Sequence, residues 1–285
     1  MPLTASVTRI SVYPADIFTV EWVCKMVIDC HTHIKCIGSG KVDASEHLEA
    51  ISAVDKCIVL PSPDGSADQL NARLSEYVAR YEQKMIGFAF IDPLNDGIAV
   101  KHLKAATEKL GLKGIVLYCS QSGFHPAHSR AMQLYESAEQ LKLPVFFHNT
   151  PVGPASILEY AQPLLLDEVA RTFPTLKIVI GNMGLPFYEQ TLCILAKHQN
   201  VFGDLSVKPG RIWEVYNLVV AAHEQGVTNK LLFGSAFPAA HPQQCMETLL
   251  GFNKLLAGAN LPTVPRGNMQ SIVERDTLKL LGIEK

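Results

Sequence analysis

Two histidines separated by one residue are the first feature of this sequence that could carry chemistry. His31 and His33 lie in "DCHTH", at the end of a short apolar run. Residues two apart in an extended strand project to the same side, so these two imidazoles can chelate one ion. Neutral imidazole nitrogens are good ligands for zinc and similar divalent metals. The spacing alone is equally compatible with two polar residues that merely end a strand.

A third histidine stands in a similar place. His148 ends the apolar run "VFFH". A lone histidine there is more often a structural residue held by hydrogen bonds, because an imidazole without a partner is costly to bury. If His31 and His33 lie at the same end of the fold, a ligand role for His148 is favoured, and the sequence predicts a metal site of three histidines.

The elements that must position these residues follow from the hydrophobic pattern. Short apolar runs alternate with longer segments of helical spacing, and many of the runs end in Gly, Pro, Asn or Ser, as buried parallel strands do. The runs cover residues 26–34, 56–63, 85–93, 112–119, 144–151, 177–184, 201–207 and 231–238. Strands that alternate with helices in this way predict an α/β fold, most economically a closed (β/α)8 TIM barrel. An open doubly wound sheet is the alternative, but no Gly-rich phosphate loop follows the first run.

The whole chain fits one large domain. Its 285 residues are close to the length of a typical (β/α)8 barrel. We therefore predict a single barrel domain over 1–285, with an N-terminal extension at 1–25 and a C-terminal helix at 265–285. The side chains at the C-terminal ends of the strands should converge at one end of the barrel, here called the mouth.

Charge and cysteine content restrict the class of protein. A formal net charge of −2 gives no electrostatic reason to expect nucleic acid or a membrane as partner. The seven cysteines are scattered, odd in number and without a C-x-x-C pair, which favours unpaired thiols in a reducing compartment. The first residues lack the apolar segment of a secretory signal. A cytoplasmic protein is the expectation.

Several motifs in register resemble the amidohydrolase-related family, the branch that contains aminocarboxymuconate-semialdehyde decarboxylase and similar hydrolases. They are "IDCHTHI", "GFAFIDP", "LKGIVLY", "LPVFFHNTP", "FPTLKIVIGNMG", "VFGDLS" and "LLFGSAFP". The resemblance covers most of the chain and implies a (β/α)8 barrel with one bound metal, usually zinc. It implies that His31, His33 and His148 are metal ligands.

The sequence departs from the family pattern at two positions. The sixth strand of the family normally ends in a catalytic histidine in a pattern like "H-x-G", where this chain has Asn182 in "GNMG". The eighth strand normally reads "F-G-S-D-x-P", with an aspartate that binds the metal and helps to activate its water, where this chain has Ala236. An amide can donate a hydrogen bond, for instance to a substrate oxygen, but it does not titrate, so the usual proton transfer is in doubt.

Other groups near the predicted mouth are candidates for that role. Asp204 ends the seventh run, although a carboxylate there commonly caps a helix or bonds a loop. His241 follows the eighth run on a loop that could overhang the mouth, or it is simply a surface imidazole. Lys208 and Arg211 could meet a substrate carboxylate, or they are solvated loop charges. Asn182, Asp204 and His241 are therefore the candidate catalytic residues.

The resulting functional hypothesis is a metal-dependent hydrolase that acts on a small molecule through a three-histidine site with Zn²⁺ or another divalent ion. A metal-dependent decarboxylase of a small carboxylated substrate is the first alternative. A non-catalytic binding relative that has lost the acid and base residues is the second. Because related barrels often form dimers, a homodimer is also expected.

Overall fold

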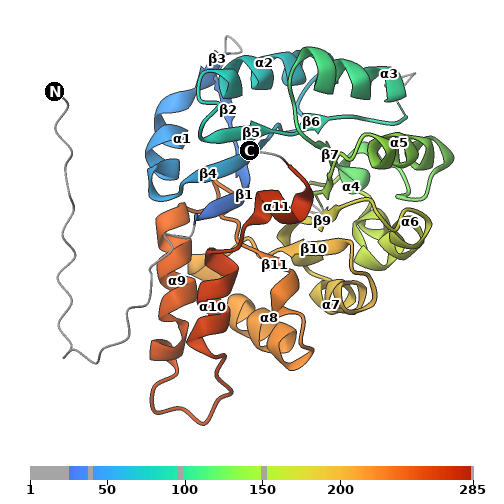
Figure 1. The fold of residues 1–285 in the computed structure, drawn as a ribbon. Helices are drawn as coiled ribbons and strands as arrows, with labels where there is room; N and C mark the ends of the chain where they lie inside the picture. The colour runs from blue at the N-terminus through green and yellow to red at the C-terminus, as the bar shows by residue number, and fades with distance from the viewer. Residues whose placement is uncertain (1–25, 38–40, 95–98, 149–152, 284–285) are drawn as a thin grey trace, which may run out of the picture.

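The apolar runs form a ring of parallel strands surrounded by helices (Figure 1). The computed structural model describes residues 26–37, 41–94, 99–148 and 153–283, so the predicted extension at 1–25 lies outside the described residues. The strands of the ring are β1 (Ile28–His33), β4 (Lys56–Leu60), β5 (Met85–Gly87), β6 (Ala89–Phe90), β7 (Ile115–Leu117), β8 (Val145–Phe147), β9 (Ile178–Ile180), β10 (Val201–Asp204) and β11 (Leu231–Leu232). The predicted (β/α)8 barrel is confirmed.

Backbone hydrogen bonds close the ring at the two places where the sheets are interrupted. The ladders run in the orders β1-β4-β5 and β11-β10-β9-β8-β7-β6. Between β5 and β6 the chain continues as one strand of the ring, because the Phe88 N–H donates to Val59 O at 3.1 Å and the Ala89 N–H donates to Gly114 O at 2.8 Å. Between β11 and β1 the Cys30 N–H donates to Phe233 O at 2.9 Å. No strand edge is left open there for another chain to pair with.

Side chains fill the barrel from both faces of the strands. Successive residues of a strand point to opposite sides, so Ile58, Val116 and Phe146 pack into the cluster inside the ring. Their neighbours Val59 and Leu117 pack into the larger cluster between the strands and the helices. The continuous apolar runs of the sequence reflect this burial on both faces.

Helices cover the outside of the ring (Figure 1). In chain order they are α1 (Ala44–Ala50), α2 (Ala67–Ala79), α3 (Ala99–Lys104), α4 (Cys119–Ser122), α5 (Ser129–Gln140), α6 (Leu166–Thr172), α7 (Tyr188–Lys197), α8 (Ile212–Glu224) and α9 (Pro242–Leu255). A two-stranded hairpin, β2 (Lys35–Ile37) and β3 (Lys41–Asp43), leaves the ring directly after β1. No helix of the described segments combines the length and apolarity needed to cross a bilayer.

The chain ends in two helices where the sequence predicted one. α10 (Arg266–Val273) and α11 (Thr277–Leu281) are separated at Glu274, and the Asp276 carboxylate accepts a hydrogen bond from the Lys279 N–H, which starts the second helix. An N-cap carboxylate satisfies a backbone donor that a continuous helix would bond internally. Leu278 and Leu281 of α11 pack into the cluster inside the ring. The second helix therefore closes the end of the barrel opposite the mouth.

Candidate metal centre

The first strand carries two of the three histidines and is irregular between them. The register of β1 against β4 shifts between Asp29 and Thr32, which marks a bulge. Simple alternation along "CHTH" predicts that Cys30 points outward, away from His31, but Cys30 packs inside the barrel. A bulge adds a residue to one strand and so breaks the alternation of side chains. It brings Cys30 and His31 to the interior together.

The ring nitrogens of the three predicted ligands converge at the mouth. His31 Nε2 lies 2.9 Å from His33 Nε2, which lies 3.2 Å from His148 Nε2. Taken over the three side chains, the candidate ligand atoms all lie within 4.8 Å of one another. At metal–nitrogen bonds of about 2.0–2.1 Å and tetrahedral angles, two ligand nitrogens are separated by about 3.3 Å. The spacing therefore fits a single ion.

Hydrogen bonds on the far side of two rings fix which nitrogen carries the proton. His31 Nδ1 lies 2.6 Å from Asp204 Oδ2, and His33 Nδ1 lies 3.0 Å from Leu60 O. Both partners are acceptors, so each Nδ1 carries the hydrogen and each neutral ring presents a lone pair at Nε2. Burial, reinforced by the neighbouring His31, lowers the pKa of His33 to about 3, so its Nε2 stays unprotonated near neutral pH. Two lone pairs that face each other at 2.9 Å are satisfied by a cation between them.

The third histidine is held by aromatic packing. Its ring centroid lies 4.7 Å from that of Tyr118 and 6.4 Å from that of Phe146. Its Nδ1 is buried and has no hydrogen-bond partner among the described atoms. Burial, together with the charges of His31 and His33, holds the pKa of His148 well below its usual range. Its ring is therefore neutral at working pH, as a metal ligand must be.

A fully buried carboxylate supports the centre from behind. Burial alone opposes the charge of Asp204, but the charge and hydrogen bond of His31, with donors from Ser206 and Asn182, hold the pKa of Asp204 below its ordinary value. Asp204 Oδ2 accepts from Ser206 Oγ at 2.6 Å and from the Asn182 backbone N–H at 2.9 Å. A carboxylate that orients a ligating histidine and raises its basicity is a common support of metal sites.

Close approach of the chain at Gly234 makes that support possible. A Cβ at this position would lie 2.1 Å from Asp204 Oδ1 and 3.2 Å from His31 Cβ. The strand after β10 can therefore pass the carboxylate only because position 234 has no side chain. The same loop contributes the Ser235 N–H, which donates to Asp29 Oδ1 at 3.1 Å and so connects it to β1.

A second chain of hydrogen bonds holds β1 from the helix side. His47 of α1 lies with Nε2 3.1 Å from Thr32 Oγ1 and Nδ1 2.8 Å from Tyr77 Oη. Thr32 Oγ1 in turn donates to Ile58 O at 2.9 Å, so it accepts the hydrogen of His47 Nε2. Burial lowers the pKa of His47 to about 4. The residue between the two ligands is thereby fixed to both α1 and β4.

The two positions that depart from the family pattern lie in strained backbone. Asn182 has φ 50° and Ala236 has φ 52°, both in the left-handed region that side-chain-bearing residues rarely adopt. Asn182 is buried and supplies its backbone N–H to Asp204, while Ala236 is partly buried beside the contact between Phe237 O and the His33 N–H, at 2.7 Å. Strain of this kind concentrates at functional sites.

The other sequence candidates lie apart from the three histidines or are already paired. His241 is exposed at the start of α9 and lines a surface groove with residues of α1 and its following turn. Lys208 and Arg211 both pair with Glu214, at 3.3 and 2.5 Å. Asp204 contacts His31 rather than the open mouth. Of the three catalytic candidates, the structure thus brings Asp204 and the backbone of Asn182 to the histidines.

Sequence reasoning missed the supporting residues. Ser206, His47 and Gly234 are not marked by any motif, because their partners lie far away in the chain. The nearest signal is Ser206, two residues after Asp204 in "DLS", a spacing typical of a carboxylate that bonds its own loop.

Comparison with known proteins identifies the class to which this geometry belongs. The model of the amidohydrolase family matches residues 64–268, which is most of the chain. The chain belongs to the amidohydrolase family. The match begins after β1 and β4, so His31 and His33 lie outside the matched segment of this amidohydrolase, and His148 lies within it. No curated protein sequence matches the chain.

Solved structures share the fold at low sequence identity. The 2,6-dihydroxybenzoate decarboxylase from Rhizobium has a TM-score of 0.69 and 14% identity, covering 92% of this amidohydrolase and 99% of that chain. A probable 2-pyrone-4,6-dicarboxylic acid hydrolase from Acinetobacter baumannii, with citric acid bound, has a TM-score of 0.64 and 14% identity, covering 90% and 99%. A dihydroxybenzoic acid decarboxylase from a Polaromonas species, with bound manganese and 2-nitroresorcinol, has a TM-score of 0.64 and 14% identity, covering 92% and 97%.

Proposed function

We propose that this amidohydrolase binds one divalent metal ion through His31, His33 and His148 and hydrolyses a small carboxylated substrate. The observation that carries the proposal is the pair of Nε2 lone pairs that face each other at 2.9 Å while their Nδ1 hydrogens are bound elsewhere. A divalent ion held by three neutral imidazoles lowers the pKa of a water at its open position to about 7 and polarises a substrate carbonyl.

The residues of the chain have separate parts in this proposal. Asp204 positions His31 and makes it more basic, and Leu60 O does the same for His33. An all-imidazole set suits zinc among the available divalent ions, and the manganese in a structural neighbour makes Mn²⁺ the second choice. Asn182 is the candidate to hold a substrate oxygen by a hydrogen bond.

The chemistry available at the mouth favours hydrolysis over decarboxylation. A decarboxylase must deliver a proton to the carbon that loses CO₂, and the family positions at 182 and 236 hold an amide and a methyl group. Neither titrates at working pH. Hydrolysis relies less on a separate acid, because the ion itself activates the nucleophile.

Decarboxylation is the second candidate, and the structural neighbours are the observation that favours it. Two of those described above are decarboxylases of dihydroxybenzoic acids. The substrate class is proposed from the same source as a small aromatic or cyclic carboxylate. A hollow of about 410 Å³ at the strand ends, lined by Pro63, Phe90 and Asp92 among others, offers space on this face. Homodimer formation and a cytoplasmic location stay predictions from the sequence.

Metal analysis tests the centre itself. The purified chain, dialysed against Zn²⁺ and then against metal-free buffer, should retain about one ion per chain by elemental analysis. His33→Ala should lose that ion. His128→Ala is the matched control, because His128 only caps α5 by accepting from the Arg130 N–H, and it should retain the metal. Equal metal content in the two variants, or none in the unaltered chain after supplementation with Zn²⁺ and Mn²⁺, would refute the proposal.

A second experiment separates the candidate reactions. The metal-loaded chain is assayed against lactones and esters of cyclic carboxylic acids, and against hydroxybenzoates with CO₂ release as readout. We expect hydrolysis to exceed decarboxylation, and Ala236→Asp to increase whichever reaction is native. If a metal-loaded chain shows neither reaction with or without Ala236→Asp, the protein is a metal-containing binder and the hydrolase proposal is wrong.

A further inference from the structure

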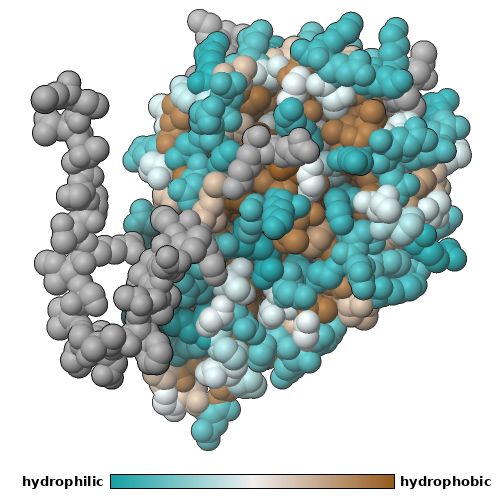
Figure 2. Space-filling model, viewed as in Figure 1, coloured by the Kyte–Doolittle hydropathy of each residue, from teal (hydrophilic) through white to brown (hydrophobic). Residues whose placement is uncertain are grey.

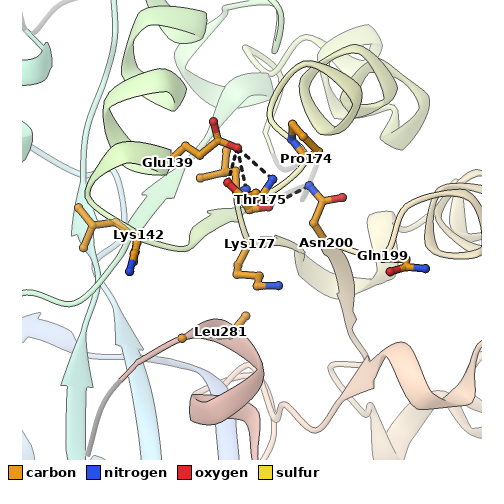
Figure 3. A pocket seen from close by; sticks show the side chains of 11 residues that line it. Glu139, Lys142, Pro174, Thr175, Lys177, Gln199, Asn200 and Leu281 are labelled. Carbon is orange, nitrogen blue, oxygen red and sulfur yellow. Dashed lines mark hydrogen bonds between the residues drawn. The ribbon is translucent and has the colours of Figure 1, made fainter.

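A cavity of about 600 Å³ lies at the end of the barrel opposite the histidines (Figure 3). Its walls are the turns that lead into β8, β9 and β10, together with the end of α11. Leu143, Pro174, Leu176 and Leu281 give it apolar surface. None of the residues of the metal centre contributes to the cavity, so it is a separate feature.

Two lysines supply positive charge to this cavity. Lys142 and Lys177 line it, and Figure 3 shows Lys177 extending from its turn toward Leu281. Within the described residues neither ammonium has a hydrogen bond or an ion pair. The one carboxylate in the lining, Glu139, is engaged instead by Thr175 Oγ1 at 2.7 Å and by the Leu176 N–H at 3.1 Å.

A third lysine adds to the positive field. Lys230 Nζ donates to the carbonyl oxygens of Gln199 at 2.6 Å and His198 at 3.0 Å, beside the same wall. Burial, and then the charge of Lys177, lower the pKa of Lys230. Three ammonium groups and one carboxylate therefore surround the cavity, and their mutual repulsion is relieved by an anion.

The backbone at Lys142 is an independent observation that points the same way. Lys142 follows the C-terminal residue of α5 with φ 55°, the position and conformation that glycine usually takes. A side chain there costs stability that glycine would not. Retention of a long cationic side chain at a strained position beside a cavity is typical of a binding role.

We propose that this cavity binds a small organic anion with an apolar body, its acidic group held by Lys142 and Lys177 and its body packed on Leu281 and Pro174. The ligand touches α11, which closes the barrel, and does not reach the metal centre. The site is therefore independent of the hydrolase proposal, and its variants should keep their metal content.

Two fluorescent probes with the same aromatic body test the proposal. The metal-loaded chain is titrated with 8-anilinonaphthalene-1-sulfonate and with the uncharged N-phenyl-1-naphthylamine. Lys142→Gln/Lys177→Gln should weaken sulfonate binding by about tenfold, which corresponds to one lost charge-assisted contact, and should leave binding of the neutral probe unchanged. Lys104→Gln/Lys109→Gln, at two exposed lysines on the outer helices, is the matched control and should bind both probes as the unaltered chain does.

Lys142→Gly distinguishes a ligand role from a structural one. It should raise the melting temperature, since it relieves the positive φ, and still weaken sulfonate binding. Inorganic phosphate should displace the sulfonate probe from the unaltered chain. Unchanged sulfonate binding in the double lysine variant, or failure of phosphate to displace the probe, would overturn the proposal.

Discussion

Individual side chains at the mouth divide into those that face the predicted ion and those that hold them in place. His31 and His33 present Nε2 because Asp204 and Leu60 O occupy Nδ1. His148 lacks such a partner among the described atoms and relies on Tyr118. We therefore expect the three ligands to differ in how strongly they depend on their neighbours.

Asp204→Asn should lower metal affinity about 10- to 100-fold, because the amide keeps the shape but neither orients His31 as a charged acceptor nor raises its basicity. Competition with a chelator of known affinity measures the effect. Asp68→Asn is the control, since Asp68 is 78% exposed and pairs only with His102 at the surface. An affinity equal to that of the control would show that Asp204 has no part in the centre.

Ala236→Gly should stabilise the protein by up to about 1 kcal/mol, because glycine adopts the left-handed region without the clash that alanine meets there. The gain is partly offset by the greater freedom of glycine in the unfolded chain. Urea unfolding measures the difference. Ala239→Gly, at an exposed neighbour without a positive φ, should instead lose stability, and a gain at both positions would contradict the argument from φ.

Strands and turns set the geometry that these side chains need. The bulge in β1 brings Cys30 and His31 into the barrel together, and the loop after β11 passes Asp204 at Gly234. Neither strand could be straightened or given a side chain at these points without moving a predicted ligand. The positions most sensitive to change are thus backbone positions.

Gly234→Ala should destabilise the protein by about 3 kcal/mol or more and weaken metal binding. Its Cβ would lie 2.1 Å from Asp204 Oδ1, a buried clash with no flexible neighbour to yield. Gly251→Ala in α9 is the matched control: a Cβ there meets nothing within 4 Å, and helix propensity predicts a gain of up to about 1 kcal/mol. Thermal and urea unfolding of both variants should show opposite signs.

The sequence was sufficient for the strands and the three histidines, and insufficient for what connects them. Each apolar run contains strand residues of the ring because burial on both faces leaves a continuous hydrophobic signal. The bulge at Cys30 and the break at Glu274 were missed, because a single inserted residue or an N-cap at Asp276 changes no periodicity over a long window. His47 and Gly234 act through contacts between distant segments, which spacing does not encode.

At the scale of the molecule, buried titratable groups couple folding to pH. The pKa of His47 is lowered from its ordinary 6.5 to about 4 by burial. The unfolded chain therefore binds more protons between these values, and stability that is present above pH 6.5 is lost as the pH falls toward 4. The raised pKa of Asp29, about 6 through burial, acts in the opposite sense, since its protonation favours the folded chain below that pH.

His47→Gln should isolate one of these contributions. The glutamine can keep a hydrogen bond to Thr32 but does not titrate. The difference in unfolding free energy between the metal-free parent and the variant should shift by up to about 3 kcal/mol between pH 7 and pH 4, with the parent losing more on acidification. A difference that stays constant with pH would show that His47 is not held neutral by the fold.

The contact between Asn182 and Asp204 has a consequence for how this protein can be altered. It is the main-chain N–H of residue 182, and not its side chain, that bonds the carboxylate behind His31. The scaffold of the centre is thus written in atoms that every amino acid except proline possesses. A designer can exchange the side chain at 182, and add an acidic one at 236, with that scaffold intact. The same separation gives evolution a way to remove or restore reactivity without rebuilding the barrel.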